Sequence, residues 1–242
     1  MNFIFIIQAF RMRSHSLLLF CALFSVSATA HDLWFDRDAS GYTLLQGHRH
    51  SAHAGSDSQP YDPAWVREAL CLTTGGKTVV PAVGKGFPVK LAGDCAAIQT
   101  HLVSGYWSKT AWETKNVPKT GVSGVLKSWF SDESVKRIDR WLPALARPLG
   151  EGLEISPTSN PLTLKAGDKL IVQVNYQGKP KAGVPVAYFG DTRGATDDEG
   201  KIAIRLRQPG IQLIAASFES PLNDGKADTA IRSAMLQFEV AP

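Results

Sequence analysis

Histidine is the residue type whose distribution in this sequence most clearly suggests chemistry. Five histidines follow the first thirty residues, and all lie in the first half of the chain: His31, His48, His50, His53 and His101. In an extended segment, side chains alternate between two sides, so His48 and His50 would project to the same side. Imidazole nitrogens are good ligands for Ni, Co, Cu and Zn ions. The sequence therefore predicts a transition-metal site built from these histidines, with a solvated histidine-rich loop as the alternative.

His31 directly follows a segment that is typical of a cleavable export signal. A pair of arginines precedes a short apolar run over residues 17–26, and Ala28 and Ala30 then form the small-residue pattern of a cleavage site. The run is shorter than the roughly 20 apolar residues that span a bilayer. We therefore expect residues 1–30 to be a signal peptide, and the mature protein to be periplasmic and not itself membrane-spanning.

The point of cleavage decides which chemistry His31 can perform. Cleavage after Ala30 would make His31 the first residue, where its free amine and its imidazole can chelate one metal ion. Cleavage after Ala28 would make it the third residue, where the amine, two deprotonated amides and the imidazole form a square-planar site suited to Cu(II) or Ni(II). Both arrangements need the α-amine that cleavage creates. The alternative is that a histidine at this position is merely compatible with the peptidase.

Cys71 and Cys95 are the two cysteines outside the export segment. An even pair in an oxidising compartment is typical of a disulfide, which we expect here. The closed loop of about 24 residues would stabilise the fold by roughly 3 kcal/mol on the chain-entropy model. A thiolate metal pair is the alternative, although neither cysteine has a second cysteine close to it in the sequence.

Motifs of known catalytic classes do not accompany these residues. The sequence contains no G-x-S-x-G, no H-E-x-x-H and no P-loop, so we do not expect an enzyme. The net charge of +4, which includes two arginines of the export segment, is too small to indicate a nucleic-acid partner. Tyr106, Trp107 and Trp112 form an aromatic cluster that could stack on a sugar, although packing is the commoner use of such residues.

The second half of the chain has the pattern of a small β-sandwich. Alternating apolar residues predict strands near 170–176, 184–188, 202–206, 213–215 and 236–240, with a turn signal between each pair. This spacing predicts an antiparallel, Ig-like or transthyretin-like sandwich over residues 151–242. A stretch rich in proline and glycine, 147–161, is the expected linker before it.

Residues 31–150 are less regular and are predicted to form a β-rich domain that contains a short helix and the histidines. Asp62 and Pro63 are typical of a helix start, which predicts a helical turn or two over 64–70. The strongest helix prediction covers Ser131 to Leu145, because Ser131 could cap it and apolar residues recur there at helical spacing. The expected fold class is mainly β, with two domains.

Several motifs resemble the DUF4198 family. In the first domain they are His31-Asp32-Leu33-Trp34, Gly47-His48 followed by Pro60-Tyr61-Asp62-Pro63, and the run from Gly150 to Ile155. The second domain adds Gly178-Lys179-Pro180 and Thr196-Asp197-Asp198-Glu199-Gly200, which many other sandwiches share. The resemblance implies a periplasmic component associated with cobalt or nickel uptake transporters. It does not account for His50 and His53.

The residues and the resemblance lead to one hypothesis and an alternative from another class. The hypothesis is a periplasmic protein that binds a divalent transition metal, Ni²⁺ or Co²⁺ first and Cu or Zn second, and delivers it to an inner-membrane uptake transporter. The alternative is a cell-envelope adhesion or carbohydrate-binding protein without metal, in which Trp107 and Trp112 form the stacking platform. A copper-dependent oxidative enzyme with an N-terminal histidine brace is a third option.

Overall fold

The computed structural model describes residues 32–49 and 58–241, and their fold is mainly β. Sixteen strands form three sheets. The helices within these ranges are three short 3-10 turns, Pro63–Trp65, Pro143–Ala146 and Pro161–Thr163. In the part of the chain that is described, no helix has the length and apolar character needed to cross a membrane. The predicted mainly β fold class is confirmed.

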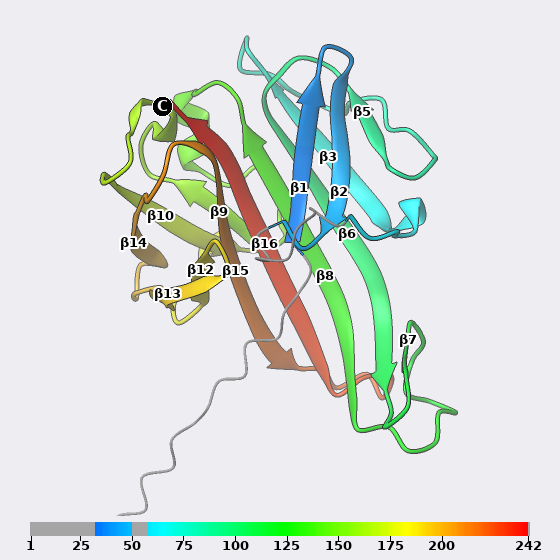
Figure 1. Cartoon of the computed structure of the whole chain (residues 1–242). Coiled ribbons are helices and arrows are strands. Elements are labelled where there is room, and N and C mark those ends of the chain that lie inside the picture. Colours follow the sequence, from blue (N-terminus) through cyan, green and yellow to red (C-terminus); the bar gives the residue numbers. More distant parts are fainter. Residues whose placement is uncertain (1–31, 50–57, 242) are drawn as a thin grey trace, which may run out of the picture.

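The largest sheet, here called the main sheet, runs through the whole molecule (Figure 1). Its strands follow the order β13-β12-β15-β16-β8-β6-β3-β4, with β7 beside β6. Their bounds are β3 (Val66–Thr73), β4 (Thr78–Val79), β6 (Cys95–Lys109), β7 (Thr114–Lys115), β8 (Lys127–Ile138), β12 (Pro185–Tyr188), β13 (Asp191–Ala195), β15 (Gly210–Pro221) and β16 (Thr229–Val240). The two central strands, β8 and β16, are parallel.

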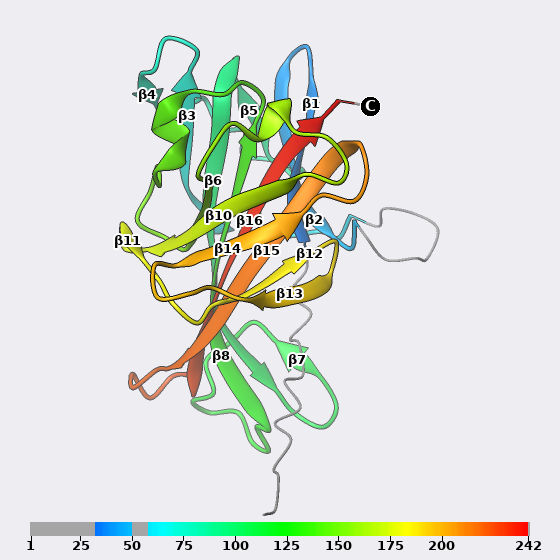
Figure 2. The ribbon, with the colours of Figure 1, turned by 90° about the vertical axis from the view of Figure 1, so that its left-hand side faces the viewer.

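Two smaller sheets cover opposite faces of the main sheet (Figures 1 and 2). One contains β1 (Asp32–Asp38), β2 (Gly41–Gly47) and β5 (Lys90–Ala92); the other contains β9 (Glu154–Pro157), β10 (Lys169–Tyr176), β11 (Lys179–Pro180) and β14 (Lys201–Arg205). Neighbouring residues of one strand enter different cores: Ile98 packs with Leu33 under β1, whereas Ala97 packs with Val172 under β10. We call these two sides of the main sheet the β1 face and the β10 face.

The helix predicted over Ser131 to Leu145 is wrong. Residues as far as Ile138 belong to β8, and only Pro143–Ala146 forms a 3-10 turn. Val135 faces the core under β1, and Ile138 faces the core under β10. A strand that is buried on both faces loses the simple alternation by which a strand is recognised, and its apolar residues can mimic helical spacing.

The helical turn predicted over 64–70 is correct only at its start. Asp62 caps the 3-10 turn, because its side chain accepts a hydrogen bond from the backbone N–H of Ala64 at 2.9 Å. At Val66 the chain already enters β3, whose pairing with β6 satisfies the backbone groups that a longer helix would have used.

The predicted domain boundary at residue 150 falls between strands of one sheet, because β16 pairs along its length with β8.

Candidate functional site

Two of the five predicted metal-binding histidines, His48 and His101, lie within the described residues. The other three, His31, His50 and His53, lie outside them. His48 follows the last residue of β2, and His101 lies in the middle of β6. The structure therefore places these two side chains in different surroundings.

The end of the β1–β2 ladder brings His48 close to a carboxylate. Asp32, the first residue of β1, pairs with Gly47, and His48 is the next residue along the chain. Burial raises the pKa of Asp32, while a hydrogen bond from the backbone N–H of Arg49 and the charge of His48 oppose that rise. An imidazole and a carboxylate thus lie near each other where two paired strands end. We call this pair, Asp32 and His48, the hairpin-end pair.

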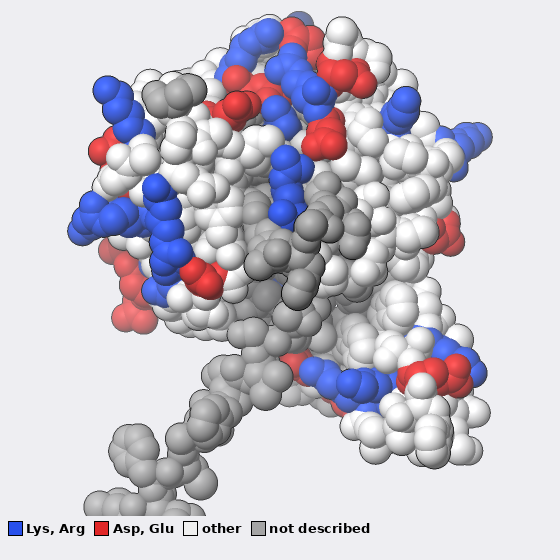
Figure 3. Space-filling model, viewed as in Figure 1, with Lys and Arg blue, Asp and Glu red and all other residues white. Residues whose placement is uncertain are grey.

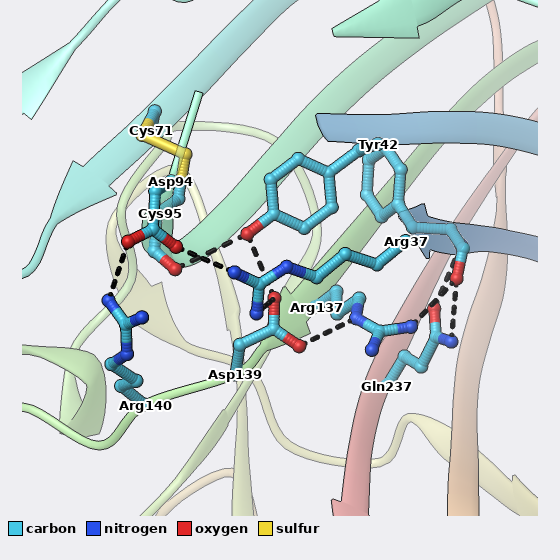
Figure 4. Close-up of polar contacts among 10 residues, drawn as sticks. Arg37, Tyr42, Cys71, Asp94, Cys95, Arg137, Asp139, Arg140 and Gln237 are labelled. Atoms are coloured by element: carbon cyan, nitrogen blue, oxygen red, sulfur yellow. Dashed lines mark hydrogen bonds and ion pairs between the residues drawn. A yellow bond between two sulfur atoms is a disulfide. The ribbon is translucent and has the colours of Figure 1, made fainter. Parts of the chain in front are cut away.

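A buried polar network fixes the β1–β2 hairpin on the main sheet (Figure 4). The Asp139 carboxylate accepts hydrogen bonds from the Tyr42 hydroxyl and from Nε of Arg137, both at 2.8 Å. Arg137 also donates to the backbone carbonyl of Phe35 at 3.0 Å, and the Gln237 side chain bonds both the N–H and the carbonyl of Phe35. Burial, with the neighbouring carboxylate, raises the pKa of Tyr42 to about 12. These bonds hold the middle of the β1–β2 hairpin, at Phe35 and Tyr42, on the main sheet.

His101 points to the β10 face and is already engaged there. Its Nε2 atom lies 2.6 Å from Oδ1 of Asp132, and its ring lies against Gly152, where a Cβ atom would stand 3.5 Å from the ring. The hydrogen bond with Asp132 raises the pKa of His101. Its neighbour Leu102 enters the core under β1. His101 and His48 are thus on different sides of the main sheet and are not brought together.

The described residues supply only part of a metal site. Within 32–49 and 58–241, no three or more His, Cys, Asp or Glu side chains are close enough together to hold a metal ion. The hairpin-end pair offers one nitrogen donor and one oxygen donor, a combination that borderline divalent metals accept. A complete site at this place needs further donors from the residues outside the described ranges.

The predicted disulfide is confirmed. Cys71 in β3 and Cys95 at the start of β6 are bonded to each other, and both are buried. Their sulfurs are therefore unavailable as thiolate ligands. A disulfide of this kind fits an exported protein, because reducing compartments keep cysteines as thiols.

The aromatic cluster predicted from the sequence is rearranged in the structure. Trp107 stacks on Trp129 across the β6–β8 ladder, with ring centroids 6.3 Å apart and planes 9° apart, and Trp65 meets Trp107 edge-on at 5.9 Å. Tyr106 points to the other face, and Trp112 is 93% exposed in the turn between β6 and β7. Trp65 and Trp129 were missed, because only the strand register reveals that they adjoin Trp107.

The chain belongs to the DUF4198 family. The model of this family, described as a domain of unknown function, matches residues 28–220. The match covers the hairpin-end pair, the disulfide and the tryptophan cluster, and it confirms the family resemblance of the motifs. No curated protein matches the chain. The family description carries no activity.

The His101–Asp132 pair should make the stability of the fold depend on pH. Because the pKa of His101 is raised above its ordinary value of 6.5, the folded state holds the proton more tightly than the unfolded state. The stabilisation is complete below the unfolded pKa and is lost as pH rises through the folded pKa. We expect wild type to exceed His101→Gln in unfolding free energy by about 1 kcal/mol at low pH only.

Urea unfolding of both proteins at about pH 5.5 and about pH 9 measures this difference. Glutamine can still donate a hydrogen bond to Asp132 but cannot take up a proton. A gap between the two proteins that is the same at both pH values would contradict the prediction.

Proposed function

We propose that the protein is a periplasmic binding protein that captures a divalent transition metal at the end of the β1–β2 hairpin and delivers it to a membrane uptake transporter. Ni²⁺ and Co²⁺ are the favoured ions, and Cu²⁺ or Zn²⁺ is also compatible with the donors. The role is one of binding rather than catalysis. The observation that carries the proposal is the hairpin-end pair, in which His48 lies near Asp32 at the end of the β1–β2 ladder.

The sequence offers a third donor beside this pair, in the residue that directly precedes Asp32. That residue is His31, which carries an imidazole and, after cleavage following Ala30, a free amine as well. Asp32 pairs with Gly47, next to His48. The proposed first ligands are therefore His31 and His48, with the Asp32 carboxylate beside them.

The types of donor favour a late first-row transition metal. Imidazole and amine nitrogens suit Ni, Co, Cu and Zn, whereas Mg²⁺ and Ca²⁺ prefer sites made of oxygen ligands. Cleavage after Ala28 in place of Ala30 would put His31 third in the mature chain and shift the preference toward square-planar Cu(II) or Ni(II). His50 is a further candidate ligand and His53 a secondary one, because both follow His48 closely in the sequence. His101 is the weakest candidate, since its ring is bonded to Asp132.

The delivery role rests on the predicted cellular location of the protein and on its family. The export signal predicted over residues 1–30 and the Cys71–Cys95 disulfide agree with a periplasmic location. The resemblance to the DUF4198 family implies an association with cobalt or nickel uptake. A membrane transporter component is therefore the proposed recipient of the metal.

Calorimetric titration of the mature protein with Ni²⁺, Co²⁺ and Cu²⁺ tests the proposal. We expect micromolar or tighter binding of at least one ion. Loss of a nitrogen ligand in His48→Ala should weaken it by roughly tenfold to a hundredfold, and Asp32→Asn by about tenfold. His101→Gln is the matched control: it also removes a histidine, but on the other side of the sheet, and binding should be unchanged.

The outcomes separate the ligands from the function. Binding that keeps its affinity in His48→Ala and in a variant lacking His31 would refute the ligand assignment. The absence of binding for all three ions would refute the function. Mass spectrometry of the mature N-terminus, done on the same sample, shows which cleavage product was titrated.

A further inference from the structure

The far halves of β6 and β8 extend beyond the β1–β2 hairpin, with β16 beside β8 and β7 beside the end of β6, and we call this part of the main sheet the arm (Figure 1). On the β1 face of this arm lie Trp107, Trp129 and, from the turn before β3, Trp65. All three are partly exposed, so they pack on one another and still present ring surface to solvent. The rings of Trp107 and Trp129 lie in nearly parallel planes, and we call this pair the platform.

A polar edge follows the platform along β8. Side chains two residues apart share a face, so Trp129, Ser131 and Glu133 lie in a row. Glu133 is opposite Leu102, which belongs to the core under β1, and this places its carboxylate on the same face as the tryptophans. The Ser131 hydroxyl donates to Glu133 at 3.4 Å, and Glu133 forms no ion pair with any described residue.

Small residues line the strands between the platform and the Glu133 carboxylate. Ser131 pairs with Gly105, where β6 bulges and no atom lies within 4 Å of the place that a Cβ would take. Alternate residues of a strand are about 6.6 Å apart, so the row from Trp129 to Glu133 is about 13 Å long. That length accommodates a short oligosaccharide.

We propose that this face of the arm binds a saccharide, with the indoles of Trp107 and Trp129 stacked on a sugar ring and the Glu133 carboxylate accepting hydrogen bonds from sugar hydroxyls. A sugar has an apolar C–H face and a hydroxyl edge, and the arm offers the complement of both. A ligand without hydroxyls would desolvate the carboxylate and leave it with Ser131 as its described hydrogen-bond donor, at a cost of free energy. Burial raises the pKa of Glu133 to about 7, so hydrogen bonds from a sugar would stabilise its ionised form.

Two features favour a neutral sugar over an ionic ligand. Lys and Arg side chains are mixed with Asp and Glu on the face seen in Figure 3, the arm included, so no single sign of charge marks the surface for an ion. Cation-binding cages surround their ligand with aromatic rings, whereas here two rings are parallel and the third meets one of them edge-on. The site is independent of the hairpin-end pair and goes beyond the proposed metal binding.

Titration with chitotriose, maltotriose and cellotriose, in the presence of EDTA and followed by tryptophan fluorescence, tests the proposal. We expect saturable binding of at least one of them. Trp129→Ala should weaken it by roughly tenfold or more, and Glu133→Gln should weaken it less, because the amide keeps one acceptor. Trp112→Ala is the matched control: it removes an exposed tryptophan that stands apart from the platform, and affinity should be unchanged.

Trp129→Phe keeps the experiment decisive if the alanine variant does not fold, since a smaller ring should retain folding and bind with intermediate affinity. Absence of binding at millimolar saccharide would overturn the proposal. So would full affinity in a folded Trp129→Ala protein, or binding of choline in place of the sugars. Because EDTA removes metal, these results are independent of the metal titration, and either proposal can fail while the other stands.

Discussion

Glu154→Ala should lower the free energy of unfolding by about 3–5 kcal/mol, because it breaks a buried ion pair and leaves its partner without a counter-charge. Lys136 in β8 and Glu154 in β9 are each 1% exposed, and the ammonium lies 2.6 Å from the carboxylate. The same carboxylate accepts hydrogen bonds from the Gln99 side chain and from the backbone N–H groups of Leu149 and Gly150. One substitution thus removes the acceptor for four donors.

The chain contains a matched control for this experiment. Lys201 and Glu199 form a pair of the same residue types at the same 2.6 Å separation, but on the surface. Exposed pairs contribute little, so Lys201→Ala should leave the urea midpoint essentially unchanged. Replacing both buried partners, in Lys136→Met with Glu154→Leu, should cost less than Glu154→Ala alone, since no charge is left buried. A Glu154→Ala protein as stable as wild type would contradict the argument.

Removal of the Cys71–Cys95 bond should lower the free energy of unfolding by roughly 3 kcal/mol. The bond closes a loop with a sequence separation of 24, and its loss gives the unfolded chain more conformations. Urea unfolding of the oxidised protein, the reduced protein and the Cys71→Ala/Cys95→Ala variant measures the effect.

Adding reductant to the double variant is the control for this second prediction, and it should change nothing. If reduced and oxidised wild-type proteins unfold at the same urea concentration, the bond does not stabilise the fold.

The sequence predicted strands well where one face of the strand is apolar and turns are sharp. Alternation identified 170–176 and 202–206, which the structure contains as β10 and β14. It failed in β8, where Val135 and Ile138 enter different cores and the pattern resembled a helix. The parallel pairing of β8 with β16 could not be predicted from the sequence, because strand order depends on contacts between distant parts of the chain.

The candidate sites were predictable to different degrees. Cys71 and Cys95 could be paired because only two cysteines remained to pair. The partner of His101 could not be foreseen, since Asp132 reaches it only through the register of β6 and β8. The same register joins Trp107 to Trp129 instead of Trp112. Predicted metal ligands His31, His50 and His53 lie outside the described residues and remain predictions.

The parallel seam between β8 and β16 has a consequence for how the molecule is made. It pairs Trp129 with Thr229, so β8, in the middle of the main sheet, is synthesised about a hundred residues before the strand that pairs with it. Until then, β8 presents an open edge of unpaired backbone groups, which is a hazard for association with other chains. The family match ends at residue 220, before β16 begins at Thr229. A fragment cut at that limit would lack its central strand, so the unit that can assemble has to reach at least Val240.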